Sequence, residues 1–137
     1  MSLEALPQTS SRGRSVTYWI VTGLFSAMMA LSAVAYLTQP VMAQAFQHLG
    51  FPPYFRVELG IAKLIGVAAL LAPVPERFKE WAYAGFGITF VSAIIAHSTV
   101  DGPAKAIGPV IAFVLLVASY ATRRPSEAEQ SRVPTFV

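Results

Sequence analysis

Residues 17–38 read TYWIVTGLFSAMMALSAVAYLT, and no formal charge interrupts them. The uncharged region around this run extends from Arg14 to Arg56, so that no Asp, Glu, Lys or Arg occurs between those two arginines. A helix needs about 20 apolar residues to cross the hydrocarbon layer of a bilayer, which is ~30 Å thick. This run therefore predicts a membrane-spanning helix over residues 17–38.

The composition of the whole chain also indicates a lipid environment. Of its 137 residues, 55% are hydrophobic and 12% are charged, whereas a soluble domain carries about 25% charged residues. The chain has no cysteine, which excludes a disulfide framework, a thiol redox couple and a cysteine-held iron–sulfur cluster. The net charge of +3 comes from few and scattered basic residues, so we interpret it as a signal of membrane topology and not of nucleic-acid binding.

Three further segments predict spans, and they cover residues 54–72, 78–99 and 104–122. Proline-containing turns separate the four predicted spans, at residues 52–53, 73–75 and 101–103. The second span is included although it is charged, because leaving it out would put the basic flanks on opposite sides of the membrane. Four spans of about 20 residues leave no room for a soluble domain. The predicted fold is all-α, a bundle of four transmembrane helices.

The predicted membrane domain covers residues 16–122. Residues 1–15 and 123–137 are rich in Ser, Pro, Glu and Arg, and this composition predicts disordered tails. Residues 39–50 alternate apolar and polar side chains and predict a short helix lying at the membrane interface. Ala43-Gln44-Ala45 resembles a signal-peptidase site, but the apolar run before it exceeds the roughly 7–15 residues of a signal peptide, so we expect the first span to be retained.

The orientation follows from the basic residues. One side of a four-span arrangement collects almost all of them, namely Arg12, Arg14, Arg77, Lys79, Arg123, Arg124 and Arg132, while Lys105 lies in a loop on the other side. Cytoplasmic loops carry the excess of Lys and Arg in membrane proteins. We therefore predict that both termini, with their tails, face the cytoplasm.

The second predicted span contains three charged residues, each of which costs about 3 kcal/mol or more at the bilayer centre. Arg56 and Lys63 are seven residues apart and share one face of a helix, whereas Glu58 points elsewhere, so no salt bridge within the helix is predicted. Lys63 lies ~13 Å below Tyr54 at 1.5 Å per residue, near the bilayer centre. Three alternatives remain open: Lys63 snorkels and bonds to hydroxyl groups, it is uncharged, or a ligand or second subunit supplies its acceptor.

Two polar residues mark the outer end of the third predicted span. His97 precedes Asp101 by four residues, a spacing that lets the carboxylate accept a hydrogen bond from the imidazole ring. Because the outer ends of neighbouring spans meet in a compact bundle, we expect these two residues to share a pocket with Arg56 and Glu58, with Lys63 at its base. The alternative is that Asp101 only begins the turn and that His97 lies among lipid headgroups.

Metal and haem binding have little support in the sequence. His48 and His97 are the two histidines of the chain, and together they would ligate one haem from the outer side. His48 falls in a predicted loop, with no neighbour in sequence that would orient its ring. We predict no metal site and no intrinsic cofactor.

The sequence resembles the DoxX-like family in two segments. The first joins residues 51–55 (FPPYF) to 59–66 (LGIAKLIG), and the second joins residues 79–85 (KEWAYAG) to Ala96-His97 and Asp101-Gly102. The resemblance covers residues 17–122 and implies a four-helix protein of the bacterial inner membrane. It also implies that Lys63 and His97 occupy polar positions of the family, and that Glu80 is the acid that opens the third helix.

The resemblance implies less about activity. The family takes its name from a small subunit of a thiosulfate:quinone oxidoreductase, and some relatives are associated with membrane oxidoreductase complexes. Because this chain lacks cysteine, direct sulfur-relay chemistry by the chain is not expected. A role facing a quinone, or one supporting a partner protein, is compatible with the resemblance.

Three hypotheses follow for the function. In the first, the chain is an accessory subunit of a membrane or periplasmic oxidoreductase partner, and Lys63 and His97 bond the carbonyl oxygens of a quinone in an apolar slot. In the second, it binds a membrane protein without catalysis, and Lys63 pairs with an acid of that partner. In the third, Arg56 and Lys63 form a path for a small anion, which would require a homo-oligomer. No catalytic constellation is complete, so we expect no catalysis by the chain on its own.

Overall fold

The computed structural model describes residues 9–123. The elements in this range are helical, with bounds α1 (Thr9–Thr38), α2 (Pro40–His48), α3 (Pro53–Leu71), α4 (Glu76–Val100), the 3₁₀ helix η2 (Pro103–Ala106) and α5 (Ile107–Thr122). No strand occurs among these residues, which confirms the prediction of an all-α fold. Within the described residues, three segments are long and apolar enough to cross a membrane, namely Arg12–Thr38, Glu76–Val100 and Pro103–Thr122.

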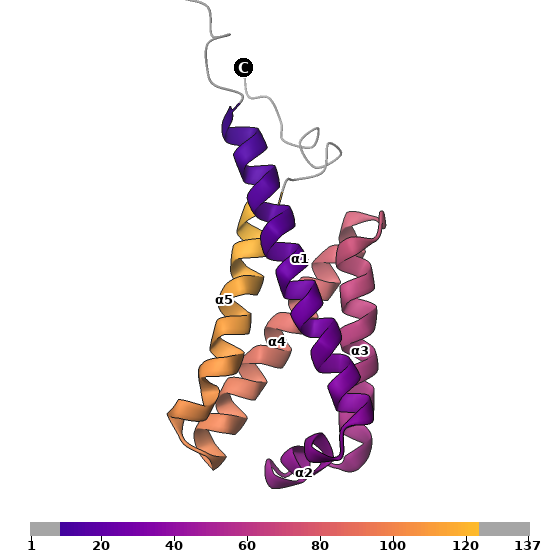
Figure 1. The fold of residues 1–137 in the computed structure, drawn as a ribbon, viewed down its shortest axis with the longest axis vertical. Coiled ribbons are helices and arrows are strands. Elements are labelled where there is room, and N and C mark those ends of the chain that lie inside the picture. The colour runs from indigo at the N-terminus through magenta and orange to yellow at the C-terminus, as the bar shows by residue number, and fades with distance from the viewer. Residues whose placement is uncertain (1–8, 124–137) are drawn as a thin grey trace, which may run out of the picture.

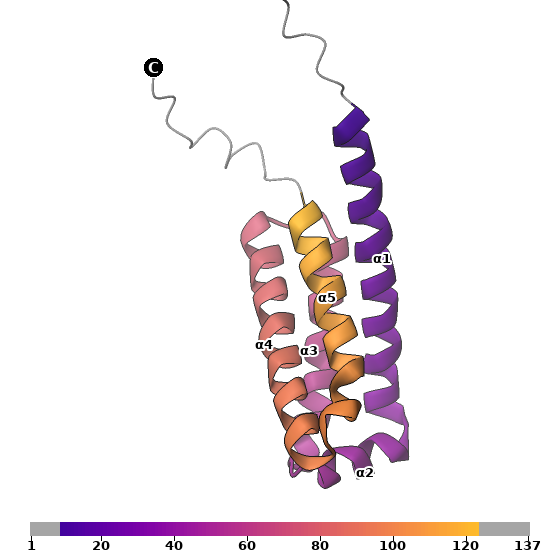
Figure 2. The ribbon, with the colours of Figure 1, turned by 90° about the vertical axis from the view of Figure 1, so that its left-hand side faces the viewer.

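The four long helices α1, α3, α4 and α5 lie side by side, each antiparallel to its neighbours (Figures 1 and 2). Around the molecule the order of contact is α1, α3, α4 and α5, and α5 returns to α1. The start of α1, the α3–α4 turn and the end of α5 lie at one end, which we call the terminal end. The short elements α2 and η2 lie at the opposite end, which we call the α2 end.

Proline and glycine set the limits of the helices. Pro40 and Pro53 are the first residues of α2 and α3, a position where the missing amide hydrogen costs nothing because the first amides of a helix lack partners. Gly50 and Gly102 have φ angles of 85° and 94° in the turns that follow α2 and α4. Such left-handed backbone favours glycine, which has no Cβ atom to clash with the backbone.

Helix α1 begins earlier than the sequence predicted. It starts at Thr9, so that helix replaces the disorder predicted for residues 9–15. The Arg14 side chain donates hydrogen bonds of 3.1 Å to the carbonyl groups of Ala121 and Arg123. Those carbonyls lie at the end of α5, where a helix leaves its last acceptors unpaired. The remaining residues of both predicted tails, 1–8 and 124–137, lie outside the described range.

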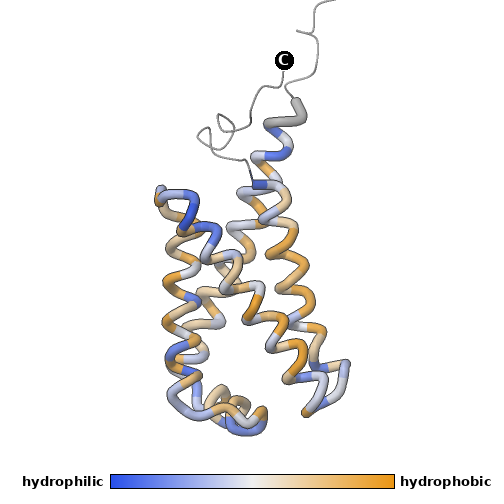
Figure 3. Tube along the Cα trace, turned by 180° about the vertical axis from the view of Figure 1, so that it is seen from behind, coloured by the Kyte–Doolittle hydropathy of each residue, from blue (hydrophilic) through white to orange (hydrophobic). Residues whose placement is uncertain are grey.

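The outward faces of the long helices are apolar. Figure 3 shows hydrophobic residues along the middle of the helices and hydrophilic residues concentrated at the two ends. Large exposed hydrophobic side chains occur on all four, among them Ile20, Leu24, Leu31, Ile65, Ile88, Ile95, Ile111 and Val114. A surface of this kind on so large a scale indicates a lipid bilayer, because water would disfavour it.

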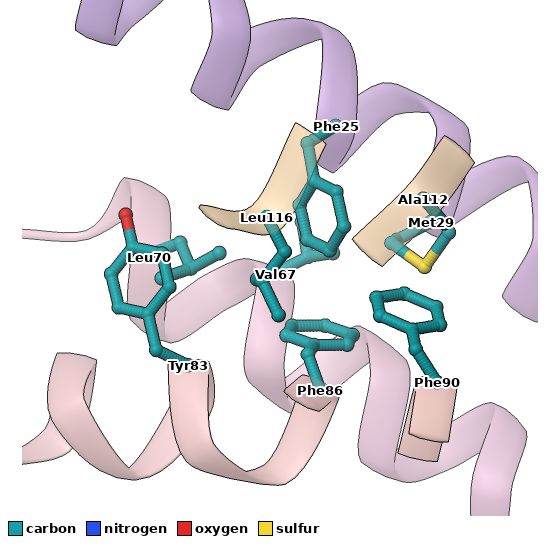
Figure 4. Packing of buried hydrophobic residues seen from close by; sticks show 9 residues of the cluster. All are labelled: Phe25, Met29, Val67, Leu70, Tyr83, Phe86, Phe90, Ala112 and Leu116. Carbon is teal, nitrogen blue, oxygen red and sulfur yellow. The ribbon is translucent and has the colours of Figure 1, made fainter. Parts of the chain in front are cut away.

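A hydrophobic cluster joins the four helices in the middle of the molecule (Figure 4). The Phe25 ring of α1 contacts two rings of α4 edge-on, with centroid distances of 5.1 Å to Phe86 and 5.9 Å to Phe90. Towards the terminal end, the buried Ser119 hydroxyl hydrogen-bonds to Thr22 at 2.6 Å and to Tyr83 at 2.7 Å. These contacts tie α1, α4 and α5 together and leave open space towards the α2 end.

Candidate ligand-binding cavity

Small-molecule sites are usually cavities of about 300 to 1,000 Å³, and a cavity of about 790 Å³ occupies the α2 half of this molecule. All five α-helices contribute to its lining. Most lining residues are apolar, and the polar ones are Ser32, Tyr36, Lys63, Thr89, Ser92 and His97. No carboxylate lines this cavity among residues 9–123. The cavity is therefore an apolar space with a few hydrogen-bonding groups in its wall.

Lys63 is buried in the wall of this cavity, with 5% of its surface exposed. Its Nζ atom donates a hydrogen bond of 2.9 Å to the Ser32 hydroxyl of α1. The same atom lies 3.7 Å from the centre of the Tyr36 ring, a cation–π distance. No carboxylate of residues 9–123 forms an ion pair with Lys63. The sequence left open how Lys63 is accommodated, and this geometry agrees with the alternative in which Lys63 bonds to a hydroxyl group.

The hydrogen bond to Ser32 uses part of the donor capacity of Lys63. A lysine ammonium group has three N–H donors, and within the described residues one of them has an oxygen acceptor. A ligand oxygen in the cavity would provide a further acceptor. Lys63 therefore supplies a buried donor at the edge of an apolar space.

His97 lines the same cavity from α4. Its Nδ1 atom is buried and lies 3.5 Å from a carboxylate oxygen of Asp101, without forming a hydrogen bond to any described residue. The predicted approach of Asp101 to His97 is thus present as a loose contact. The Nδ1 atom therefore faces Asp101, while the ring of His97 lines the cavity.

Asp101 has a closer partner that the sequence did not reveal. Its Oδ1 atom lies 2.5 Å from Nε2 of His48, the last residue of α2. This hydrogen bond is the largest influence on the Asp101 carboxyl and lowers its pKa from the ordinary value. His48 was predicted to lie in a loop without support, yet Asp101 orients its ring. The two residues are 53 positions apart, and no local pattern connects them.

Arg56 and Glu58 lie away from the cavity. Arg56 donates to the backbone carbonyl of Tyr36, near the end of α1. Glu58 is exposed on the outer side of α3. The structure therefore brings Lys63 and His97 to one cavity, places Asp101 behind His97, and leaves the other two predicted residues outside.

Aromatic residues close the α2 end of the cavity, and sequence reasoning did not identify them as site residues. The buried Phe46 ring of α2 packs on Tyr36 at a centroid distance of 5.0 Å and on Phe51 at 5.9 Å. Phe51 in turn stacks on Phe55 at 5.0 Å. The sequence features that could have predicted this cluster are the FPPYF run and the apolar residues of the predicted interfacial helix.

Glu80 has structural contacts at the terminal end. It accepts hydrogen bonds from Arg123 and, at 3.3 Å, from the Tyr120 hydroxyl. Arg123 also lies 3.7 Å from Glu76. These contacts join the start of α4 to the end of α5, far from the cavity. The acid at the opening of α4 therefore links two helices in this chain.

The comparisons with known proteins give one result about the family. The model of the DoxX-like family matches residues 20–119, which include all of α2, α3 and α4 and most of α1 and α5. No curated protein and no solved structure matches the chain. The matched region contains both resembling segments and the whole wall of the cavity. The chain therefore belongs to the DoxX-like family.

Proposed function

We propose that this protein crosses the bacterial inner membrane four times, with both termini in the cytoplasm, and binds a quinone as an accessory subunit of a membrane oxidoreductase system. The fourth crossing in this proposal is α3. Its 19 residues correspond to about 28 Å at 1.5 Å per residue. Lys63 is turned inward, and Arg56 lies within the first turn, so neither charge has to face the hydrocarbon.

The observation that carries the proposal is the composition of the cavity wall. A quinone is a flat apolar ring with two carbonyl oxygens, and it needs hydrogen-bond donors within an apolar slot. The cavity of about 790 Å³ offers Lys63 Nζ as such a donor, and the ring of His97 also lines it. A wall without carboxylates favours an acceptor-rich ligand, because no oxygen anion of the protein competes for the donors.

The same geometry gives less support to the two other hypotheses. A partner protein would have to insert an acidic side chain into the interior to reach Lys63, which is 95% covered by its own chain. A path for anions would require Arg56 and Lys63 to face one channel, but Arg56 donates to the Tyr36 carbonyl and does not line the cavity. A small ligand that enters the cavity agrees with this geometry better than a partner protein or an anion path does.

The test is to purify the protein from native-type membranes in mild detergent and to identify the extracted small molecules by mass spectrometry. We expect one quinone per chain in the wild type and its loss in Lys63→Met. A hydrogen bond from a charged donor contributes about 1.5–3 kcal/mol, which corresponds to a loss of affinity of roughly 10- to 150-fold.

Lys105→Met is the matched control, because it removes an exposed lysine in η2 outside the cavity and should retain the quinone. His97→Leu should weaken binding in the same direction as Lys63→Met. Wild-type protein that carries phospholipid alone, or a Lys63→Met variant that retains the quinone, would contradict the proposal.

A further inference from the structure

A second hollow lies on the outer face of the molecule, between α3 and α4. It is a groove of about 350 Å³. Its residues run from Leu59 to Ala69 along α3 and from Thr89 to Phe78 along α4. Ten residues of helix correspond to about 15 Å, so the groove extends from the level of Lys63 towards the terminal end. Its side chains are largely apolar, including the 66% exposed Trp81.

The groove and the cavity meet at the same side chains. Leu59, Lys63 and Thr89 line both of them. The Thr89 hydroxyl donates to the Gly85 carbonyl within its own helix, and no described contact ties it across to α3. Side chains of α3 and α4 therefore separate the interior cavity from the lipid-facing groove. Lys63 lies where the two hollows meet.

The α2 end offers no comparable route for an apolar chain. The rings of Phe46, Phe51 and Phe55 pack on one another there, and Phe46 is buried. Beyond them lie exposed polar residues such as His48. A hydrocarbon tail leaving through that end would pass into water, which disfavours it by about 0.8 kcal/mol for each CH₂ group.

We propose that the ligand is a quinone with a long hydrocarbon tail, which enters sideways from the bilayer between α3 and α4. This inference rests on the proposed function. The ring lies in the cavity beside Lys63, and the tail lies in the groove along Ala62, Gly85 and Trp81. Since lipid is as apolar as the groove, the tail gains little affinity by lying there. The groove instead gives the tail a place outside water while the ring occupies the cavity, so that a blocked groove excludes a ring that carries a tail.

The test compares two probes in wild-type protein and in two variants reconstituted in nanodiscs. The probes are a tail-less dimethoxy-methyl-benzoquinone and the same ring carrying a decyl chain. Ala62→Phe fills the groove from α3, because Ala62 lines the groove and not the cavity. Ala68→Phe is the matched control, an equal substitution at an exposed position of the same helix that lines neither hollow.

We expect Ala62→Phe to weaken binding of the decyl probe by about tenfold or more and to leave binding of the tail-less probe unchanged. Ala68→Phe should change neither. Gly85→Leu provides a second block from α4, where an added Cβ atom meets nothing within 4 Å, and it replaces Ala62→Phe if that variant does not fold.

The remaining outcomes separate the two proposals. If both blocking variants bind the decyl probe normally, or weaken both probes equally, the tail does not use this groove, and the inference is overturned while quinone binding stands. If wild-type protein does not bind the tail-less ring, or binds it equally well after Lys63→Met, the proposed function fails and the lateral route fails with it.

Discussion

At the scale of single residues, Gly66 determines how closely α3 and α4 approach. A Cβ atom added at this position would lie 2.6 Å from Cε2 and 2.7 Å from Cζ of Phe86. The Phe86 ring has little freedom to move, because it contacts Phe25 edge-on at 5.1 Å and stacks on Phe90 at 6.1 Å. Glycine is therefore the residue that fits this contact.

We predict that Gly66→Ala destabilises the protein by about 1–3 kcal/mol, the usual effect of overpacking a well-filled core. The measurement is thermal or denaturant unfolding in a fixed detergent. Gly85→Ala is the control on the facing helix, where the added methyl group meets open space and the higher helix propensity of alanine should raise the stability by up to about 1 kcal/mol. Equal stability of the two variants would show that a methyl group at position 66 does not clash with Phe86.

The hydroxyl group of Tyr83 gives a second prediction at this scale. It bonds at 2.7 Å to the buried Ser119 of α5. Removing it by Tyr83→Phe should cost about 1 kcal/mol, the net contribution of a buried hydrogen bond, in the same unfolding experiment. Tyr54→Phe is the control, since Tyr54 is exposed and donates to no described residue. A loss no larger than that of the control would contradict the role of the Tyr83–Ser119 bond.

At the scale of elements, α2 closes the cavity. The sequence predicted a helix over residues 39–50 lying at the interface, and the structure has α2 over Pro40–His48. Its apolar residues Met42 and Phe46 line the cavity, while His48 bonds to Asp101 across the α2 end. Packing and one polar contact therefore hold this element in place.

The polar contact makes the position of α2 sensitive to acid. The pKa of Asp101 is lowered in the folded protein, chiefly by the hydrogen bond with His48 and further by His97. A carboxyl group with a lowered folded-state pKa stabilises the structure above its unfolded value of about 3.9, and this contribution is lost as the pH falls through the folded value. Acidification below about pH 4 should therefore loosen α2.

Spin labelling measures this effect directly, because the chain has no cysteine of its own. A nitroxide on Gln47→Cys, an exposed position of α2, should gain mobility as the pH falls below about 4. In Asp101→Asn the label should be mobile already at neutral pH and should respond little to acid. A label on Lys105→Cys in η2 reports any general loosening. If the α2 label stays equally rigid over this range in both backgrounds, His48 and Asp101 do not anchor α2.

At the scale of the whole molecule, the distribution of basic residues supports the proposed orientation. Arg12, Arg14, Arg77, Lys79 and Arg123 lie in α1, α4 and the end of α5 near the terminal end, whereas Lys105 lies in η2 at the α2 end. By the positive-inside rule this distribution predicts that the terminal end faces the cytoplasm, as proposed above. This orientation would place the His48–Asp101 contact and the closed end of the cavity on the periplasmic side.

Single cysteines test both the orientation and the crossing by α3. A membrane-impermeant maleimide added to intact cells should label Gln44→Cys in α2 and Lys105→Cys in η2. It should label Arg77→Cys, in the first turn of α4, only after the cells have been permeabilised. Labelling of Arg77→Cys in intact cells together with Gln44→Cys would mean that α3 does not cross the membrane, because the two positions flank that helix.

Local features of the sequence were sufficient for the helical fold. Largely apolar segments of about 20 residues, separated by prolines, predict helices because a chain in lipid must satisfy its backbone hydrogen bonds internally. Their limits are close to those observed: spans predicted over 54–72 and 78–99 correspond to α3 (Pro53–Leu71) and α4 (Glu76–Val100). The early start of α1 was missed because residues 9–15 are rich in Ser and Arg, a composition that predicts a disordered tail when it is considered alone.

The contents of the site depended on the tertiary structure. The sequence identified Lys63 and His97 as unusual, since polar groups inside a membrane span are costly. It did not supply the Ser32 hydroxyl that Lys63 bonds, 31 residues away, or the contact of His48 with Asp101, 53 residues away. Hydropathy and proline act along the chain and determine where helices form. The rotation of each helix, and with it the cavity, is set by the shapes of side chains that meet from different helices.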